Sequence, residues 1–220
     1  MEMPYLWLFF TLTTLLTLYL FYKGTKQSKA VLLICALWII LQGMVAYTGF
    51  YKVIDTLPPR FALLLLPPLM VIGFLFSTSK GRAFLDACDQ QWLTYLHVVR
   101  IPVELVLYWL FMAKYVPELM TFEGRNFDIL SGLTAPLVAY LAFHKKLNSK
   151  ILLFWNLVCL GLLLNIVINA ILSAPSAFQT QAFDQPNVGV FYFPFVWLPC
   201  FIVPVVLLSH LVCIRQIIKK

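Results

Sequence analysis

The chain has 220 residues, of which 62% are hydrophobic and 11% are charged, and its net charge is +7 at pH 7. Because an ordinary soluble domain carries about 25% charged residues, this chain lacks the polar side chains that a solvated surface requires. The composition excludes an ordinary soluble domain. It predicts one all-α domain over residues 1–220, a bundle of membrane-spanning helices.

The sequence lacks the short motifs of the common catalytic and nucleotide-binding sites. There is no Walker loop, no GxGxxG, no HExxH and no GxSxG. The five cysteines are scattered, with no metal-ligand spacing, which predicts neither a disulfide framework nor a zinc site. These absences favour a protein without catalytic residues, although they leave the question of enzymatic activity open.

Seven apolar stretches are each long enough, some with flanking residues, to cross a hydrocarbon core of about 30 Å, which requires about 20 helical residues. Pro67-Pro68 in the third stretch predicts a broken or strongly kinked helix, and Pro194, Pro199 and Pro204 predict a bend in the seventh. The first stretch has no basic segment before it and no cleavage motif after it, so we interpret it as a span rather than a signal peptide. The seven stretches cover residues 4–22, 31–51, 60–77, 93–116, 127–143, 151–172 and 192–214.

Lysine and arginine are unevenly distributed between alternate connections. Eleven of the sixteen cations lie at residues 23–29, 80–82, 145–150 and 215–220, whereas four lie in the other set of connections. Because short cytoplasmic connections are rich in Lys and Arg, we predict an inner-membrane protein with its N-terminus outside and its C-terminus in the cytoplasm. The cations are divided over four loops instead of forming one patch, so we predict no nucleic-acid partner.

The fourth stretch carries ionisable residues within an apolar run, LHVVRIPVELVLYWLF at residues 96–111. His97, Arg100, Glu104 and Tyr108 follow a spacing of three or four residues and therefore share one face of a helix. We expect this face to point into the bundle. Its four side chains are candidate contacts for a ligand or for a migrating ion.

Glu104 would lie about 16 Å into a helix that starts near Leu93, close to the middle of the bilayer. A charge at that depth costs at least about 2.5–3.5 kcal/mol. Glu104 must therefore be protonated, paired with a cation or exposed to a hydrated cavity, and Arg100 is the nearest candidate partner. Two interpretations stay open: a carboxylate that binds a proton or substrate, or a structural ion pair that fixes helix packing.

Polar residues in the sixth and seventh stretches are further candidates. His210 lies at a depth similar to that of His97, and two histidines on different helices could ligate a haem. We favour the alternative, two hydrogen-bonded interior histidines, and predict no cofactor and no metal. Asn165 and Asn169 lie one turn apart, either as ligand contacts or as residues that form hydrogen bonds between helices.

The connection between the fourth and fifth stretches is polar, with the sequence PELMTFEGRNFDI. Within it, Glu123, Arg125, Asn126 and Asp128 form a candidate cluster at the outer mouth of the bundle, and Arg125 could reach Asp128. The alternative is an ordinary solvated loop. The outer segment 173–190 is either a lid over the same mouth or a second solvated loop.

The segments HVVRIPVELVLYWLF and VPELMTFEGRNFDILSGLTAP lie within roughly residues 93–137. They resemble an uncharacterised family of bacterial integral membrane proteins. The resemblance implies a multi-span membrane protein. It implies no activity and no catalytic residues.

Three classes of function are compatible with these features. The first is a transporter of small solutes or ions, or a ligand-sensing bundle, which would use the buried polar residues. The second is an intramembrane enzyme or a haem or redox subunit. The third is a non-catalytic assembly partner that joins other membrane subunits or a second copy of the chain. We favour the first, with the lipid bilayer and a small molecule or ion as partners.

Overall fold

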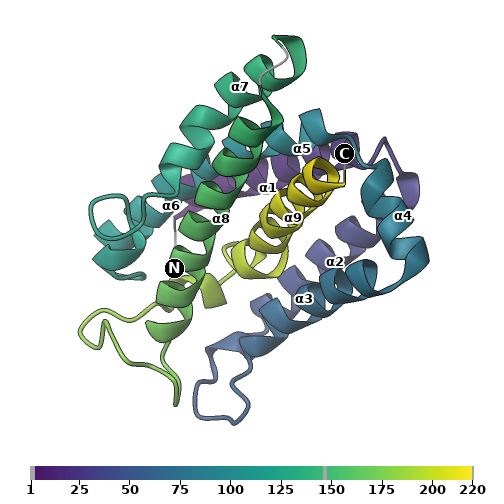
Figure 1. Cartoon of the computed structure of the whole chain (residues 1–220). Coiled ribbons are helices and arrows are strands. Elements are labelled where there is room, and N and C mark those ends of the chain that lie inside the picture. Colours follow the sequence, from purple (N-terminus) through teal and green to yellow (C-terminus); the bar gives the residue numbers. More distant parts are fainter. Residues whose placement is uncertain (1–2, 146–147, 220) are drawn as a thin grey trace.

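The structure, a computed structural model, describes residues 3–145 and 148–219, and every regular element in these ranges is helical (Figure 1). The longer helices are α1 (Pro4–Gly24), α2 (Lys29–Tyr47), α3 (Ala62–Ser77), α4 (Ser79–Ala87), α5 (Gln90–Leu96), α6 (Arg100–Met112), α7 (Ile129–His144), α8 (Ser149–Leu172) and α9 (Val203–Ile218). Short 3₁₀ or π turns are η1 (Phe50–Lys52), η2 (His97–Val99), η3 (Glu118–Met120), η4 (Gly189–Phe191) and η5 (Leu198–Ile202). The all-α prediction is confirmed.

Five helical runs are long and apolar enough to cross a membrane: α1, α2, the run from α5 to α6, α8, and the run from η5 to α9. Helices α3 and α4 meet at 96° and add a sixth span if they are counted together. Helix α7 is apolar but has only 16 residues. The chain is therefore a multi-span helical membrane protein, and these criteria give five or six spans instead of the predicted seven.

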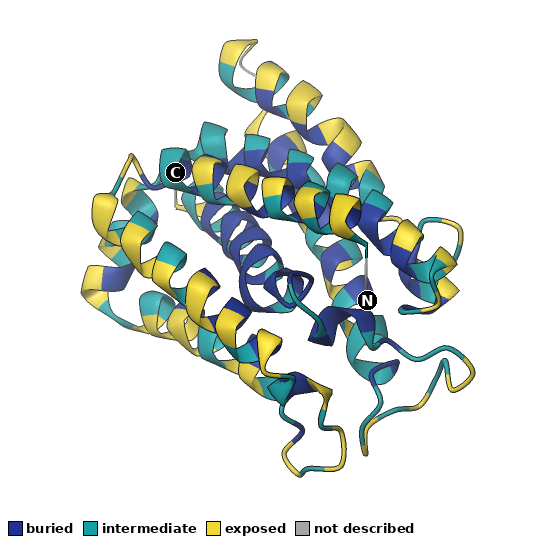
Figure 2. Cartoon of the chain, turned by 180° about the vertical axis from the view of Figure 1, so that it is seen from behind, coloured by how far each residue is buried: buried dark blue, intermediate teal, exposed yellow. Residues whose placement is uncertain are grey.

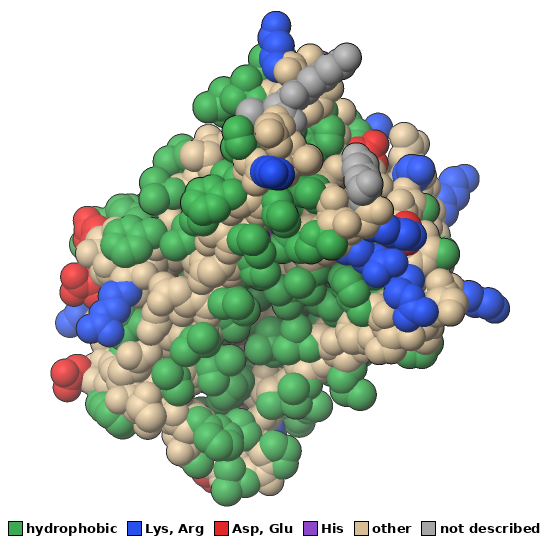
Figure 3. Space-filling model, in the orientation of Figure 1, with side chains coloured by type: hydrophobic (Ala, Val, Ile, Leu, Met, Phe, Trp, Pro, Cys, Tyr) green, Lys and Arg blue, Asp and Glu red, His purple; other side chains and the backbone are tan. Residues whose placement is uncertain are grey.

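Hydrophobic side chains cover much of the face of the molecule that Figure 3 shows. Leu37, Phe74, Leu137 and Phe154, from four different helices, are all more than half exposed. In water such a surface would be unfavourable, because exposed apolar patches of this extent drive association. Contact with the acyl chains of a bilayer explains it.

Helix α9 lies in the middle of the bundle, as the dark ribbon in Figure 2 shows. It packs against α5 and α8, with further contacts to α3 and α4. Val206, Ser209, His210 and Cys213 on α9 are all buried, so its polar side chains face protein instead of lipid. This central position allows α9 to carry a histidine into the core.

The predicted break at Pro67-Pro68 is wrong in position. Helix α3 continues through both prolines, and the chain turns instead at Thr78. The Thr78 hydroxyl accepts a hydrogen bond from the Gly81 N–H at 3.1 Å and so caps α4. A Cβ atom at Gly81 would lie 2.3 Å from the Leu75 carbonyl oxygen, so only glycine allows this close turn.

The bend predicted in the seventh stretch is present as the π turn η5 before α9. Pro204 has no N–H, so it cannot donate the usual helical hydrogen bond to the carbonyl of Cys200. The indole Nε1–H of Trp38 on α2 donates to that carbonyl at 2.9 Å instead. Trp197 Nε1–H donates to the carbonyl of Ile39 at 2.9 Å, so two indole hydrogen bonds join α2 to the bend.

The connections gather at two ends of the bundle. At one end the Asp89 N–H donates to the Gly24 carbonyl, and Arg215 and Lys219 contact the carboxylate of Asp86. At the other end the N–H groups of Val188 and Gly189 donate to the Tyr115 carbonyl. Lys146 and Lys220, which belong to the predicted cation-rich connections, lie outside the described residues.

Candidate functional site

The polar stripe predicted in the fourth stretch points into the bundle. His97, Arg100 and Glu104 are no more than 2% exposed, which confirms that this face is interior. Tyr108 differs, because it is only half-buried and stacks on Phe122 with 5.1 Å between the ring centroids. The stripe therefore contributes three side chains to the core, and its fourth side chain packs against the connection between α6 and α7.

Arg100 pairs with Asp128 instead of Glu104. Arg100 Nη1 lies 3.0 Å from Asp128 Oδ1, and both side chains are buried. This is an ion pair by distance, but its angles leave Asp128 Oδ1 without a well-directed hydrogen bond. Within residues 3–145 and 148–219, no ion pair joins Arg100 to Glu104. The prediction that Arg100 neutralises Glu104 is wrong, because Asp128, in the connection before α7, forms the ion pair with the guanidinium instead.

A close approach of α7 to α6 makes this ion pair possible. A Cβ atom at Gly132 would lie 3.0 Å from the backbone nitrogen of Ile101 and 3.3 Å from the Cβ of Arg100. Because Gly132 has no side chain, the first turn of α7 packs directly on α6. Asp128 immediately precedes α7 and is thereby held beside Arg100.

Glu104 is held by an amide. Asn126 Nδ2 donates to both carboxylate oxygens of Glu104, at 2.6 and 2.7 Å, and to the carbonyl of Met120 at 3.0 Å. Asn126 Oδ1 accepts from the backbone N–H of Asp128 at 3.0 Å, a local turn typical of asparagine. Asn126 therefore fixes Glu104 and Asp128 relative to each other, and it gives Glu104 no compensating charge.

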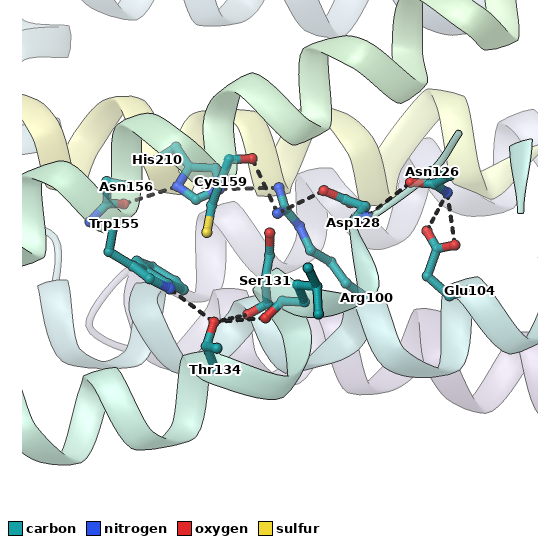
Figure 4. Close-up of polar contacts among 11 residues, drawn as sticks. Arg100, Glu104, Asn126, Asp128, Ser131, Thr134, Trp155, Asn156, Cys159 and His210 are labelled. Carbon is teal, nitrogen blue, oxygen red and sulfur yellow. Dashed lines mark hydrogen bonds and ion pairs between the residues drawn. The ribbon is translucent and has the colours of Figure 1, made fainter. Parts of the chain in front are cut away.

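On its other side Arg100 contacts His210 of α9. Arg100 Nη2 lies 3.1 Å from His210 Nε2, and Arg100 Nη1 donates to the Cys159 carbonyl at 3.3 Å. A guanidinium can only donate, so Nε2 accepts and the ring proton lies on Nδ1. Nδ1–H then donates to Asn156 Oδ1 at 2.9 Å. Figure 4 shows the resulting polar row, from Asn156 at one end to Glu104 at the other.

His97 stacks on His210, with 3.9 Å between ring centroids and 19° between the planes. Rings this close leave no room for a porphyrin or an ion between them, and both nitrogens of His210 already have partners. The haem option therefore has no support in this arrangement. The expectation of two hydrogen-bonded histidines holds for His210 only, since neither ring nitrogen of His97 has a hydrogen-bond partner among the described residues.

Glu104 and Asp128 border a cavity of about 390 Å³. This volume is typical of a small-molecule site. The cavity lies among α3, α6, α8, the segment after α8, and the bend before α9. Its other lining residues are apolar, with the exception of Asn187. Asn187 is buried, and its Oδ1 has no hydrogen-bond partner in the part of the chain that the structure describes.

The remaining predicted residues lie apart from this row. Asn165 Nδ2 donates to the Arg125 carbonyl at 2.9 Å, and Asn169 Oδ1 accepts from Gln181 Nε2 at 3.0 Å, so both connect α8 to the neighbouring loops. Glu123 and Arg125 are exposed. The expected contact between Arg125 and Asp128 is therefore wrong, since Asp128 is buried against Arg100. Of the outer cluster, the structure brings only Asn126 and Asp128 to the site.

Two residues of the site were not predicted. Asn156 is an isolated amide in an apolar run of α8, a signal as strong as that of Asn165, but its depth relative to His210 is not evident from sequence. Asn187 belongs to the polar segment 173–190, and nothing in its local sequence distinguishes it from the other polar residues there. That segment is neither a free loop nor a simple lid, since Ala174, Asn187 and Val190 are buried and form part of the cavity wall.

Comparisons with known proteins assign a family to the chain but no activity. No curated protein and no solved structure matches the chain. A family model described as a domain of unknown function, DUF8737, matches residues 58–218. This match covers the cavity, the buried ion pair and most of the helices, including the segment that carried the family resemblance. The chain therefore belongs to the DUF8737 family of unknown function.

Proposed function

We propose that the protein is a ligand-binding membrane bundle, a transporter or a sensor of a small molecule, and that its binding site is the Glu104 end of the internal cavity. The observation that carries the proposal is that Glu104 is buried, has no cationic partner within residues 3–145 and 148–219, and borders a cavity of about 390 Å³. A structural acid would be expected to pack against its counter-ion. Glu104 instead borders a space that a ligand can occupy.

The arrangement of charges supports a binding role. The two terminal nitrogens of Arg100 contact Asp128, Cys159 and His210, and none of these contacts involves Glu104. The remaining nitrogen, Nε, has no hydrogen-bond partner among the described residues. A buried carboxyl group without a cation must take up a proton or another positive group, because an unpaired charge is strongly disfavoured away from water. Intramembrane acids of this kind commonly mark substrate or ion pathways.

The lining of the cavity indicates what sort of molecule could enter. Leu66 on α3 and Phe178 after α8 line the cavity and are also exposed on the outer surface, so the cavity opens toward the apolar face of the bundle. In Figure 3 hydrophobic side chains surround this region, which lies between α8 and α3 in Figure 1. An amphiphilic ligand that dissolves in the bilayer could reach the site without crossing water.

The proposal includes a topology of seven spans in the inner membrane, with α3 and α7 as the two short spans and α4 along the cytoplasmic surface. The contacts of Asp86 with Arg215 and Lys219, and of Asp89 with Gly24, support it, because they gather three of the cation-rich connections at one end. In the proposed topology the N-terminus is outside and the C-terminus is in the cytoplasm, because the cation-rich connections are expected to be cytoplasmic.

Native mass spectrometry of the protein released from membranes tests the proposal. The wild-type chain should carry a co-purified small molecule, and Glu104→Gln should lose it while the protein keeps its helical content and thermal midpoint. The matched control is Glu118→Gln, since Glu118 is an exposed acid in the outer connection. If Glu104→Gln retains the same adducts, or if it unfolds, Glu104 is a structural residue and the proposal fails.

A further inference from the structure

We infer that the ligand's head group is a primary ammonium on a single apolar chain, and that it binds at Glu104 in exchange for a proton. This inference rests on the proposed function, since it specifies the chemistry of the same cavity. Three observations carry it: the hydrogen-bonding character of the polar lining, the balance of buried charges, and the apolar remainder of the wall.

The polar lining of the cavity offers acceptors. Asn187 Nδ2 donates to the Ala170 carbonyl at 3.1 Å, whereas Asn187 Oδ1 accepts no hydrogen bond from the described residues. Among the described residues, Asp128 Oδ1 lacks a well-directed hydrogen bond, and the oxygens of Glu104 accept from Asn126 alone. A ligand that satisfies these groups must donate hydrogen bonds. An ammonium group supplies three donors, whereas a carboxylate or phosphate supplies none when fully ionised.

The charges favour a single positive head group. In the described part of the chain, the charged groups buried at or next to the cavity are two carboxyls, Glu104 and Asp128, and one guanidinium, Arg100. The buried His210 beside Arg100 is neutral, because its Nε2 accepts from the guanidinium, and His97 stacks on His210. Asp128 neutralises Arg100, which leaves Glu104 as the acid that requires one positive charge. A divalent metal ion fits poorly, because Ca²⁺ takes six to eight oxygen ligands, whereas the polar side chains that line the cavity in the described part of the chain are Glu104, Asp128 and Asn187.

The rest of the wall favours an alkyl chain. Residues of α3, α8 and the bend before α9 present Leu, Ile, Val, Pro and Phe side chains to the cavity. Burial of an apolar chain against these side chains is favourable, and it becomes more so with each CH₂ group. Since the cavity also reaches exposed residues such as Leu66, a longer chain can extend toward the lipid.

The exchange balances in atoms and charge. When the cavity is empty, Glu104 holds a proton and is a neutral acid. When the ligand binds, its ammonium group stays protonated and forms an ion pair with the Glu104 carboxylate, and the proton of Glu104 leaves to solvent. The titratable residues that line the cavity are Glu104 and Asp128. Arg100, on α6, forms the ion pair with Asp128, and His210, on α9, forms a hydrogen bond with Arg100. With Asp128 paired to Arg100, Glu104 is the residue that exchanges its proton.

Calorimetric titration of the full chain in nanodiscs of neutral lipid tests the inference, with empty nanodiscs as the blank. The probes are n-decylamine, n-decanol and n-decanoate, which share a chain, and n-butylamine, which shares the head group. Decylamine should bind with release of one proton, measured from the dependence of the heat on buffer ionisation enthalpy, and should bind more tightly as the pH rises.

Glu104→Gln should weaken decylamine binding about 10- to 100-fold and abolish the proton release, because hydrogen bonds to charged groups contribute about 1.5–3 kcal/mol. Glu118→Gln should change neither.

The outcomes separate this inference from the proposed function. If decanol or decanoate binds as tightly as decylamine and Glu104→Gln weakens that binding, the ammonium assignment is overturned while the cavity remains a ligand site. Decylamine binding without proton release would overturn the exchange. Failure of every probe to bind would overturn the ammonium assignment and the exchange, whereas the proposed function would fail only if Glu104→Gln also keeps the co-purified adducts of the wild-type chain.

Discussion

At the scale of single residues, the two buried histidines differ in a way that their sequence positions do not reveal. His210 uses both ring nitrogens, one toward Arg100 and one toward Asn156, whereas His97 uses neither and contacts its neighbours through its ring faces. His210 is therefore a polar connection between α6, α8 and α9. His97 is a packing residue that carries an unsatisfied polar group.

This difference predicts opposite responses to the same substitution. His210→Phe should lower the free energy of unfolding by about 1–3 kcal/mol, because it leaves buried partners of the imidazole without a hydrogen bond. His97→Phe should be neutral or stabilising, since it keeps an aromatic ring and removes unsatisfied nitrogens. Thermal unfolding of both variants in detergent measures the difference. Equal destabilisation by the two substitutions would contradict the assigned roles.

The sequence predicted which residues of the stripe face inward, but it did not predict their partners. Helical spacing was sufficient to place His97, Arg100 and Glu104 on one interior face. The same spacing suggested an ion pair between Arg100 and Glu104, because it relates only residues of one helix and contains no information about neighbouring elements. The actual partner of Arg100 comes from the connection before α7, and no local pattern specifies how closely Gly132 allows that connection to approach.

At the scale of elements, the π turn before α9 depends on a hydrogen bond from another helix. Pro204 leaves the Cys200 carbonyl without its helical donor, and Trp38 supplies the replacement. The sequence predicted a bend from the three prolines of this stretch. It could not predict the donor, because an indole on α2 has no sequence relation to a carbonyl in the last span.

Trp38→Phe should therefore lower the free energy of unfolding by about 1–3 kcal/mol, since it removes the donor and leaves a buried carbonyl unsatisfied. Trp109→Phe is the matched control, because Trp109 is 41% exposed. Differential scanning calorimetry of the two variants makes the comparison. If Trp109→Phe lowers the free energy of unfolding as much as Trp38→Phe does, the effect comes from the smaller ring and not from the lost hydrogen bond.

Helices α4 and α9 are joined by a second, pH-sensitive contact. Hydrogen bonds from Arg215 and Lys219 lower the pKa of Asp86 from 3.8 to about 2. Because the folded-state pKa is depressed, the contribution of this contact to stability is fully present above about pH 4 and is lost as the pH falls toward 2. The difference in thermal midpoint between wild type and Asp86→Asn should be constant above pH 4 and vanish near pH 2. A difference that persists unchanged at pH 2 would contradict this assignment.

At the scale of the whole molecule, composition and cation distribution carried most of the information. They predicted an all-α membrane bundle, which the structure and its exposed apolar faces bear out. The number of spans was harder to predict, because α3 and α7 have only 16 residues each and neither qualifies as a span by itself. The cavity was not predictable, since it forms where α3, α6, α8 and the outer segment meet.

The proposed topology predicts which surface positions face each side of the membrane. A cysteine introduced at Ser79 or Ser149, both exposed, should react with an impermeant maleimide only after the cells are opened. A cysteine at Asp55 or Asp184, also exposed, should react in intact cells. Reaction of all four positions from the same side would contradict the span count or the orientation.

The account depends most on Glu104 being accessible from the apolar cavity. An apolar carbodiimide, which reacts with protonated carboxyl groups and dissolves in lipid, tests this directly when the modified residue is identified by peptide mass spectrometry. Glu104 should be labelled, its labelling should slow when decylamine is present, and a water-soluble carbodiimide should label exposed acids such as Glu118 instead. If the apolar reagent modifies exposed acids and leaves Glu104 untouched, the carboxyl group does not face an accessible cavity, and the ligand site does not exist.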